Sequence, residues 1–112
     1  MNQTTLGKII RNRRIELNIS QRSLANRLVG TERKYCSPQL LHNIEHDIRT
    51  GKQYWQSISK ELDIPIEVFT YYGLLAKSGL YPSVEIPFEV IQSLIQNMHN
   101  CITAYLHYEN KA

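Results

Sequence analysis

The stretch SQRSLANRLVGTERKYCSPQLLHNIE, residues 20–45, decides the fold of this chain. It opens on Ser20, a preferred N-cap residue, and apolar side chains then recur at helical spacing. Ser37 is a second N-cap, and Pro38 after it suits the first turn of a helix, where a missing N–H loses no partner. The stretch therefore predicts two short helices joined by a polar loop.

The residues on either side continue the helical pattern. Apolar positions at helical spacing predict four further helices, at 5–17, 53–62, 65–79 and from 87 to about 108. Thr4 or Thr5 is a plausible N-cap for the first, and Gly30 suits the C-terminus of the helix that begins at Gln21. We therefore expect an all-α chain with a five-helix domain at 1–79, a linker at 80–87 and a long amphipathic helix within 88–112.

Charge is distributed unevenly between the two halves of the chain. Residues 1–60 contain eleven Lys and Arg against four Asp and Glu, a net charge of +7, whereas residues 61–112 contain two against six, a net charge of −4. A basic half that also forms a helical domain is typical of a polyanion binder. The alternative is a solvated basic surface, and charge alone leaves the two readings equally open.

Several classes of protein are disfavoured by what the sequence lacks. There is no run of about 18 apolar residues and no apolar segment near the start, so we expect neither a membrane span nor a secretory signal. Cys36 and Cys101 are far apart, which favours a cytoplasmic protein with reduced thiols. His42 and His46 lie four positions apart without a third ligand, so we expect no metal and no cofactor. No nucleophile or phosphate loop indicates an enzyme.

The two helices around the loop carry the parts of a bihelical DNA-binding unit. In the second of them Leu41 and Ile44 point to the core, so helical spacing leaves four residues on the outer face. Gln and Asn suit bidentate pairing with adenine, and a proline ring can contact a thymine methyl group. We therefore predict base contacts from the outer-face residues Pro38, Gln39, His42 and Asn43.

A wider pattern of single residues includes Leu6-Gly7, Arg11, Arg14, Ser20-Gln21, Leu24-Ala25, Ser37, Leu41, Ile44-Glu45 and Arg49, followed by the stretch 60–69. Over about residues 5–70 this pattern resembles the phage-repressor (Cro/CI, or XRE) helix-turn-helix family. The resemblance implies a lambda-repressor-like domain and a sequence-specific transcriptional regulator of the repressor type, with double-stranded DNA as its partner.

The resemblance also implies roles for matching positions. Arg14 and Glu45 would form a buried ion pair that ties the first helix to the third, and Gln21 would clamp a phosphate. Arg49 and Lys52 fall in the loop that usually approaches the DNA backbone. With neighbouring polar and basic residues added, the expected backbone contacts are Gln21, Arg22, Arg33, Lys34, Ser37, Arg49 and Lys52.

The sequence departs from the family between the two helices. Ser37 follows Leu24 by 13 positions, roughly six more than is usual, and surface insertions of this kind cost little closure entropy. The extra residues include Arg33, Lys34 and Tyr35, so we hypothesise that the extended turn itself contacts the DNA backbone.

The last predicted helix has a wide apolar stripe. Its members recur at spacings of three and four, the pattern of an interhelical seam, or of a sixth helix that covers its own domain. We favour a homodimer, because a two-fold dimer contacts both halves of a palindrome. The predicted interface is Ile91, Leu94, Ile95, Met98, Cys101, Ile102 and Tyr105.

A second function stays open. The same scaffold would serve as a protein-interaction module, an antitoxin or antirepressor, whose acidic C-terminal part blocks a partner. Tyr and Met in the stripe would also suit an antagonist protein or peptide.

Overall fold

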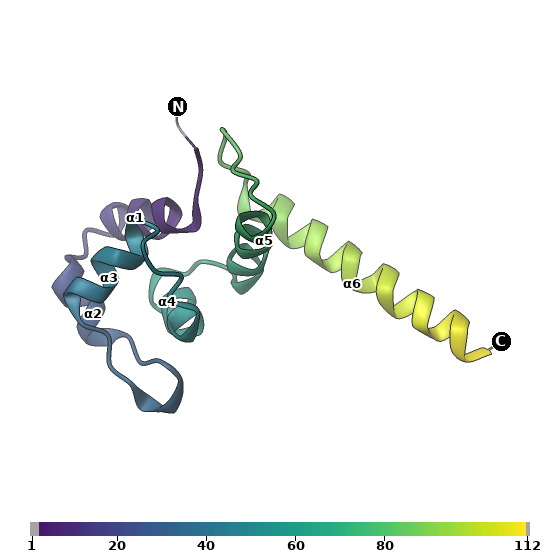
Figure 1. Ribbon diagram of the computed structural model, residues 1–112, viewed down its shortest axis with the longest axis horizontal. Coiled ribbons are helices and arrows are strands. Elements are labelled where there is room, and N and C mark those ends of the chain that lie inside the picture. Colours follow the sequence, from purple (N-terminus) through teal and green to yellow (C-terminus); the bar gives the residue numbers. More distant parts are fainter. Residues whose placement is uncertain (1–2, 112) are drawn as a thin grey trace.

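The computed structural model describes residues 3–111. Within this range the chain forms six α-helices and two 3₁₀ turns, and no strand (Figure 1). The prediction of an all-α chain is therefore confirmed. In chain order the elements are α1 (Leu6–Glu16), α2 (Gln21–Arg27), η1 (Thr31–Arg33), α3 (Pro38–Glu45), η2 (Lys52–Tyr54), α4 (Trp55–Leu62), α5 (Ile66–Lys77) and α6 (Phe88–Lys111).

Side-chain caps fix where the first three helices begin. The hydroxyl oxygens of Thr5, Ser20 and Ser37 each accept a hydrogen bond from the backbone N–H three residues later, at 3.3, 3.1 and 3.1 Å. Each such cap stabilises its helix by about 1 kcal/mol. These caps confirm the helix starts that the sequence predicts at Ser20 and Ser37, and they select Thr5 over Thr4.

The core lies among α1 to α5, whose inward faces supply fully buried apolar side chains. It contains Ile10 from α1, Leu24 from α2, Leu41 from α3, Ile58 from α4 and Phe69 from α5. Figure 1 shows α1 to α4 gathered at one end of the molecule, with α5 between them and α6.

α1 and α3 approach each other closely and are joined by an ion pair. A Cβ atom on Gly7 would lie 2.6 Å from the carbonyl oxygen of Ile44, so only glycine fits this crossing. Arg14 Nε and Nη2 donate to the Glu45 carboxylate at 2.7 and 3.0 Å. Glu45 is only 2% exposed, so the structure contains the buried pair that the family resemblance implies.

The extended turn between α2 and α3 has a definite shape. Val29 and Tyr35 form an isolated antiparallel bridge, and Gly30 N–H donates to the Lys34 carbonyl at 2.7 Å. Gly30 is extended, at φ −85° and ψ −176°, and a Cβ atom on it would meet the Tyr54 ring at 2.8 Å. The expectation that Gly30 ends α2 is wrong, because the helix ends at Arg27 with Leu28 as its C-cap. The close approach of the Tyr54 ring is the constraint on this glycine.

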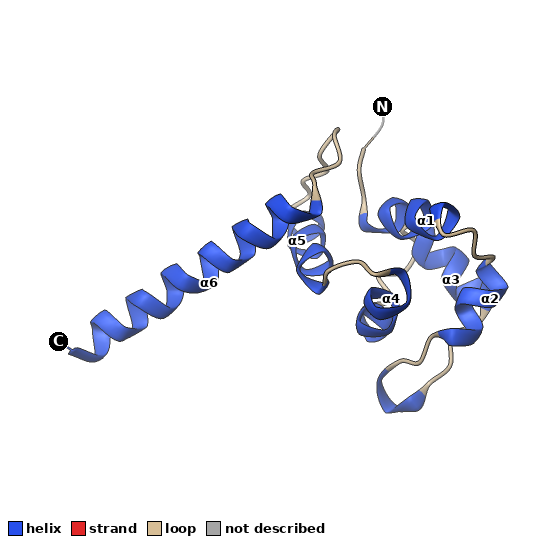
Figure 2. Ribbon diagram, turned by 180° about the vertical axis from the view of Figure 1, so that it is seen from behind, coloured by secondary structure: helices blue, strands red, loops and turns tan. Residues whose placement is uncertain are grey.

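α6 begins inside the domain and then leaves it. Ile91 is 0% exposed and belongs to the core, and Phe88 and Ile95 pack against that core. The segment before α6 is also bonded to the N-terminal segment, since Thr4 N–H donates to the Pro82 carbonyl at 2.6 Å. Beyond Ile95 the helix projects away from the other helices (Figures 1 and 2).

The segment 80–87, predicted as a linker, joins α5 to α6 without a helix and is tied to the domain at Pro82 and Ile86. The core extends into α6 as far as Ile95, which corrects one expectation about the dimer interface. Ile91, expected in a dimer interface, is buried within its own chain and is unavailable to a partner. None of the helices within the described range is long and apolar enough to span a membrane.

Candidate nucleic-acid interface

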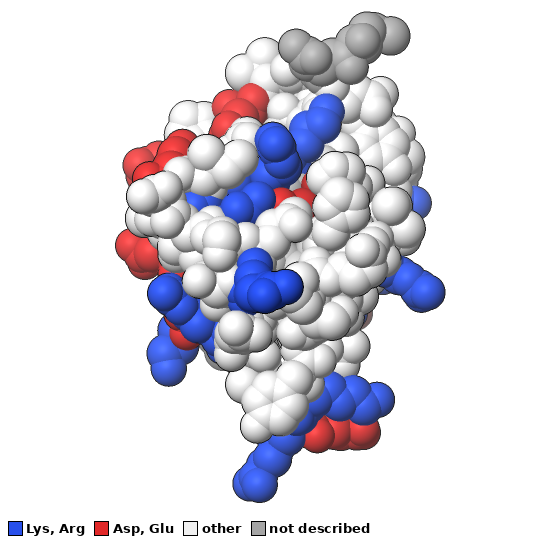
Figure 3. All heavy atoms as spheres, turned by 90° about the vertical axis from the view of Figure 1, so that its left-hand side faces the viewer, with Lys and Arg blue, Asp and Glu red and all other residues white. Residues whose placement is uncertain are grey.

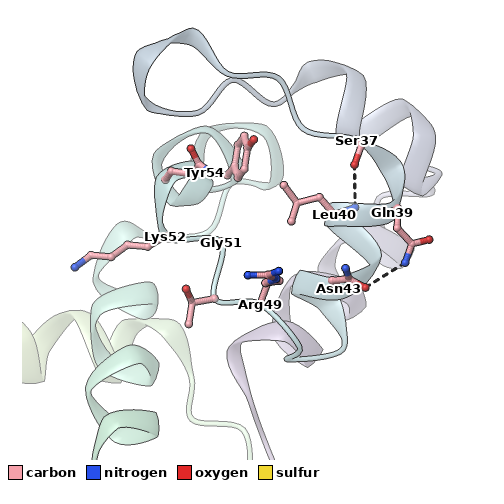
Figure 4. Close-up of a pocket in the computed structure, with 10 residues that line it drawn as sticks. Ser37, Gln39, Leu40, Asn43, Arg49, Gly51, Lys52 and Tyr54 are labelled. Carbon is pink, nitrogen blue, oxygen red and sulfur yellow. Dashed lines mark hydrogen bonds between the residues drawn. The ribbon is translucent and has the colours of Figure 1, made fainter.

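The outer face of α3 and the loop after it line a single open concavity of about 550 Å³ (Figure 4). Five residues that the sequence assigns to DNA contacts lie together in its walls. They are Ser37, Gln39, Asn43, Arg49 and Lys52. Residues separated by up to 15 positions thus converge on one surface, with two amides from α3 and two cations from the loop.

Gln39 and Asn43 form a pair on α3. Gln39 Nε2 donates to Asn43 Oδ1 at 3.2 Å, one helical turn along the exposed face (Figure 4). The bond leaves Gln39 Oε1 free to accept and Asn43 Nδ2 free to donate. Adenine offers the complementary pattern in the major groove, with its N6 amino group as donor and N7 as acceptor. The pair thus keeps one acceptor and one donor for a further partner, and these are the groups that a purine edge would pair with.

The loop 49–52 is held against α3 and α4. Arg49 N–H donates to the Asn43 carbonyl at 3.3 Å, and the Trp55 indole N–H donates to the Thr50 carbonyl at 3.0 Å. Gly51 has φ +63°, and a Cβ atom there would lie 2.4 Å from Ile44 Cδ1. These restraints hold Arg49 and Lys52 in the wall of the concavity that the amide pair also lines. In Figure 4 Arg49 lies nearer to Asn43, whereas the Lys52 amine points away from the amides.

Two of the predicted base contacts lie outside the concavity. Pro38 is exposed at the first turn of α3. His42 is half-buried and stacks on His46, with ring centroids 4.1 Å apart. Within residues 3–111 no three His, Cys, Asp or Glu side chains gather as metal ligands, and these stacked rings acquire no third partner.

The side chain of Gln21, predicted to contact a phosphate, has a partner within the chain. Its Nε2 donates at 3.1 Å to Glu45 Oε1. The Glu45 carboxylate thus receives three hydrogen bonds, two from Arg14 and one from Gln21. Gln21 therefore ties the start of α2 to the end of α3, and the residue is half-buried there.

The remaining predicted backbone contacts lie on exposed surface. Arg22 is exposed on α2, and Arg33 and Lys34 are exposed on the extended turn. Lys34 Nζ is 4.0 Å from Glu32 Oε2, a weak exposed pair. Figure 3 faces the end of the molecule formed by α1 to α3, where Lys and Arg spheres spread across the surface and reach its lower tip.

Tyr54, to which helical spacing in the sequence assigns packing and no DNA contact, lines the concavity and is also part of the core. Its ring is 2% exposed, and its hydroxyl donates to the Tyr35 carbonyl at 3.1 Å. Burial raises the pKa of the Tyr54 phenol above its ordinary value, and burial likewise raises the pKa of the nearby Cys36 thiol.

Comparison with protein-family models, with curated protein sequences and with solved structures gives no match to this chain. Function is therefore inferred from the concavity, the charge around it and the free half of α6.

Proposed function

We propose that this protein is a sequence-specific transcriptional regulator of the cytoplasm, a repressor that binds double-stranded DNA as a homodimer. In this proposal α1 to α5 act as a lambda-repressor-like domain and α3 enters the major groove. The observation that carries it is the Gln39–Asn43 amide pair on the exposed face of α3, beside Arg49 and Lys52 in one concavity.

The dimensions and charge of this surface suit a duplex. The major groove, about 12 Å wide, admits an α-helix whose outer face carries hydrogen-bonding side chains. Arg49 and Lys52 lie at the edge of the same concavity, where phosphates would flank a helix in the groove. In this reading the amides select the sequence and the cations supply salt-dependent affinity.

The free half of α6 supports the dimer. Leu94, Met98, Ile102 and Tyr105 are 46–60% exposed on a helix that leaves its own domain. Apolar stripes of this kind are covered in stable assemblies, and the same stripe on a second copy is self-complementary under two-fold symmetry. A homodimer would present two copies of α3 to a palindromic operator.

Binding-site selection from random duplex DNA tests the assignment of α3. We expect an enriched palindromic motif with the native protein and loss of base preference with Gln39→Ala/Asn43→Ala. The chain offers a matched control, because Gln96 Nε2 donates to Asn100 Oδ1 at 3.0 Å on exposed α6. Gln96→Ala/Asn100→Ala removes the same kind of pair and should leave the motif unchanged. An identical motif from both double variants would refute the base-contact assignment.

The dimer has its own test. Met98→Glu places a charge in the stripe without touching the core, since Met98 is exposed in the single chain. Sedimentation should give a dimer for the native protein and a monomer for the variant. A native protein that sediments as a monomer at micromolar concentration would refute the dimer.

The exposed stripe also keeps the second candidate function open. A partner helix of another protein would fit the same apolar face, as an interaction module of the antitoxin or antirepressor type requires. A monomer without an enriched DNA motif would favour that function over the regulator.

A further inference from the structure

A second hollow lies on the other side of the loop 49–52. It is an open groove of about 610 Å³, between the N-terminal segment 4–7, the loop and one face of α5. This volume falls within the range of roughly 300–1,000 Å³ that is typical of small-molecule sites. Its lining is mainly apolar and includes Trp55, Leu74 and Leu80.

The charges around this groove indicate what it would bind. Three cations line it, namely Arg49, Lys52 and Lys77. Asp47 is the only acidic residue among the described residues of the lining. Its carboxylate is already engaged, since Oδ2 accepts from the Thr5 hydroxyl at 2.6 Å and Oδ1 accepts from Gly7 N–H at 3.1 Å. Among its described residues the lining therefore offers three exposed cations and no carboxylate that lacks a hydrogen bond within the chain.

We propose that this groove binds a small amphipathic anion, with an apolar body against Trp55 and Leu74 and one carboxylate among the cations. A neutral apolar molecule would leave the three cations without a partner, and a polyanion would leave the apolar floor uncovered. One carboxylate on a short hydrocarbon or aromatic body matches both features.

The position of the groove links such a ligand to DNA binding. Arg49, Thr50 and Lys52 line both this groove and the concavity beside α3, so the loop is the wall between them. A ligand carboxylate that pairs with Arg49 or Lys52 on the groove side removes a cation that would otherwise contact a DNA phosphate. The ligand and DNA would then weaken each other's binding by the same factor. This coupling rests on the proposed function, whereas binding of the anion does not.

The first test measures binding without DNA. Trp55 is the single tryptophan of the chain and lies in the groove wall, so its fluorescence reports occupancy. Octanoate is the probe, and 1-octanol is the neutral probe of equal chain length. We expect a saturable change in Trp55 fluorescence with octanoate and markedly weaker binding of 1-octanol.

Three variants locate the site. Leu74 is 48% exposed, so Leu74→Glu should fold. The new carboxylate has the same charge as octanoate and should weaken octanoate binding about tenfold or more. Lys77→Gln should weaken octanoate by about two- to fivefold, the scale of one partly solvated charge. Lys60→Gln is the matched control, because Lys60 is exposed on α4 away from the groove, and it should change nothing.

Each outcome decides the proposal. An absent or unsaturable fluorescence response, or equal affinities in native protein and Leu74→Glu, would overturn the anion site. The second test adds octanoate to protein bound to duplex DNA, and weaker DNA binding in native protein but not in Leu74→Glu supports the coupling. A DNA affinity that is unchanged by saturating octanoate would overturn the coupling. Saturable octanoate binding by a chain that binds no DNA would instead leave the anion site standing and refute the regulator.

Discussion

The buried pair between Arg14 and Glu45 gives the sharpest prediction about stability. Glu45→Ala removes a carboxylate that is 2% exposed and accepts three hydrogen bonds. The guanidinium would keep only its bond from Nη1 to the Ile19 carbonyl, at 2.8 Å, and its charge would remain largely buried. Breaking such a pair by removing one partner costs about 3–5 kcal/mol. We therefore expect the free energy of unfolding to fall by about 3–5 kcal/mol in Glu45→Ala.

The assay is equilibrium urea unfolding followed by Trp55 fluorescence and by helical circular dichroism, which should give coincident transitions. The chain supplies a matched control in Arg13 and Glu16, an exposed pair at 3.3 Å on α1. Glu16→Ala should cost at most about 1 kcal/mol, because solvent screens that pair. A loss below about 1 kcal/mol in Glu45→Ala, equal to the control, would refute the assignment of a buried stabilising network.

The double variant Arg14→Met/Glu45→Leu distinguishes the cost of an unpaired Arg14 charge from the cost of lost packing around α3. Replacing both charges with apolar side chains removes the desolvation cost together with the attraction, and such replacements are often close to neutral. We expect it to be more stable than Glu45→Ala alone by about 2 kcal/mol or more. A double variant as unstable as the single one would show that packing around α3, and not the unpaired Arg14 charge, dominates the loss.

Three further predictions concern other parts of the chain. Arg33→Ala/Lys34→Ala should lower affinity equally for cognate and random duplexes and flatten the dependence of affinity on salt, and an unchanged slope would exclude the extended turn from the backbone contacts. Cys101 is exposed and Cys36 is buried with a raised thiol pKa, so a disulfide reagent should modify Cys101 in the folded Met98→Glu variant and reach Cys36 only on unfolding. Burial raises the pKa of Tyr54 above 10.0, so the phenol of the folded state stays protonated to a higher pH than that of the unfolded state. The free energy of unfolding should therefore be flat up to about pH 9 and fall above it, and the fall should be less steep in Tyr54→Phe.

Local chemistry explains what the sequence could predict. Ser20 and Ser37 cap the helices that follow them through hydrogen bonds that reach only three residues along the chain. The apolar spacing of α2 and α3 then determines which face of each helix is buried, and the polar face of α3 stays exposed to solvent and to a partner. Gln39 and Asn43 could be placed on one surface because helical spacing alone brings residues four apart together.

The errors arise where distant segments decide the outcome. Gly30 has the residue type of a helix C-terminus, but the ring of Tyr54 requires a glycine there for another reason. At Gln21 the sequence does not show the hydrogen bond to Glu45, because Glu45 is 24 positions away along the chain. The apolar stripe of α6 is continuous in sequence, and periodicity cannot tell that Ile91 is covered by its own domain while Met98 is not. Only tertiary packing distinguishes these cases.

The extended turn joins α2 and α3, which pack together through the buried core. The turn is tied at both ends, by Val29 N–H to Ser57 Oγ at 3.1 Å and by the Tyr54 hydroxyl to the Tyr35 carbonyl at 3.1 Å. Arg33 and Lys34 lie between these ties, exposed and outside the concavity that contains the amides. The proposed base contacts and the proposed backbone contacts of the turn therefore lie on separate segments. Under the proposed function, charge removed from the turn should weaken binding to every sequence alike, whereas amides removed from α3 should change which sequence is preferred.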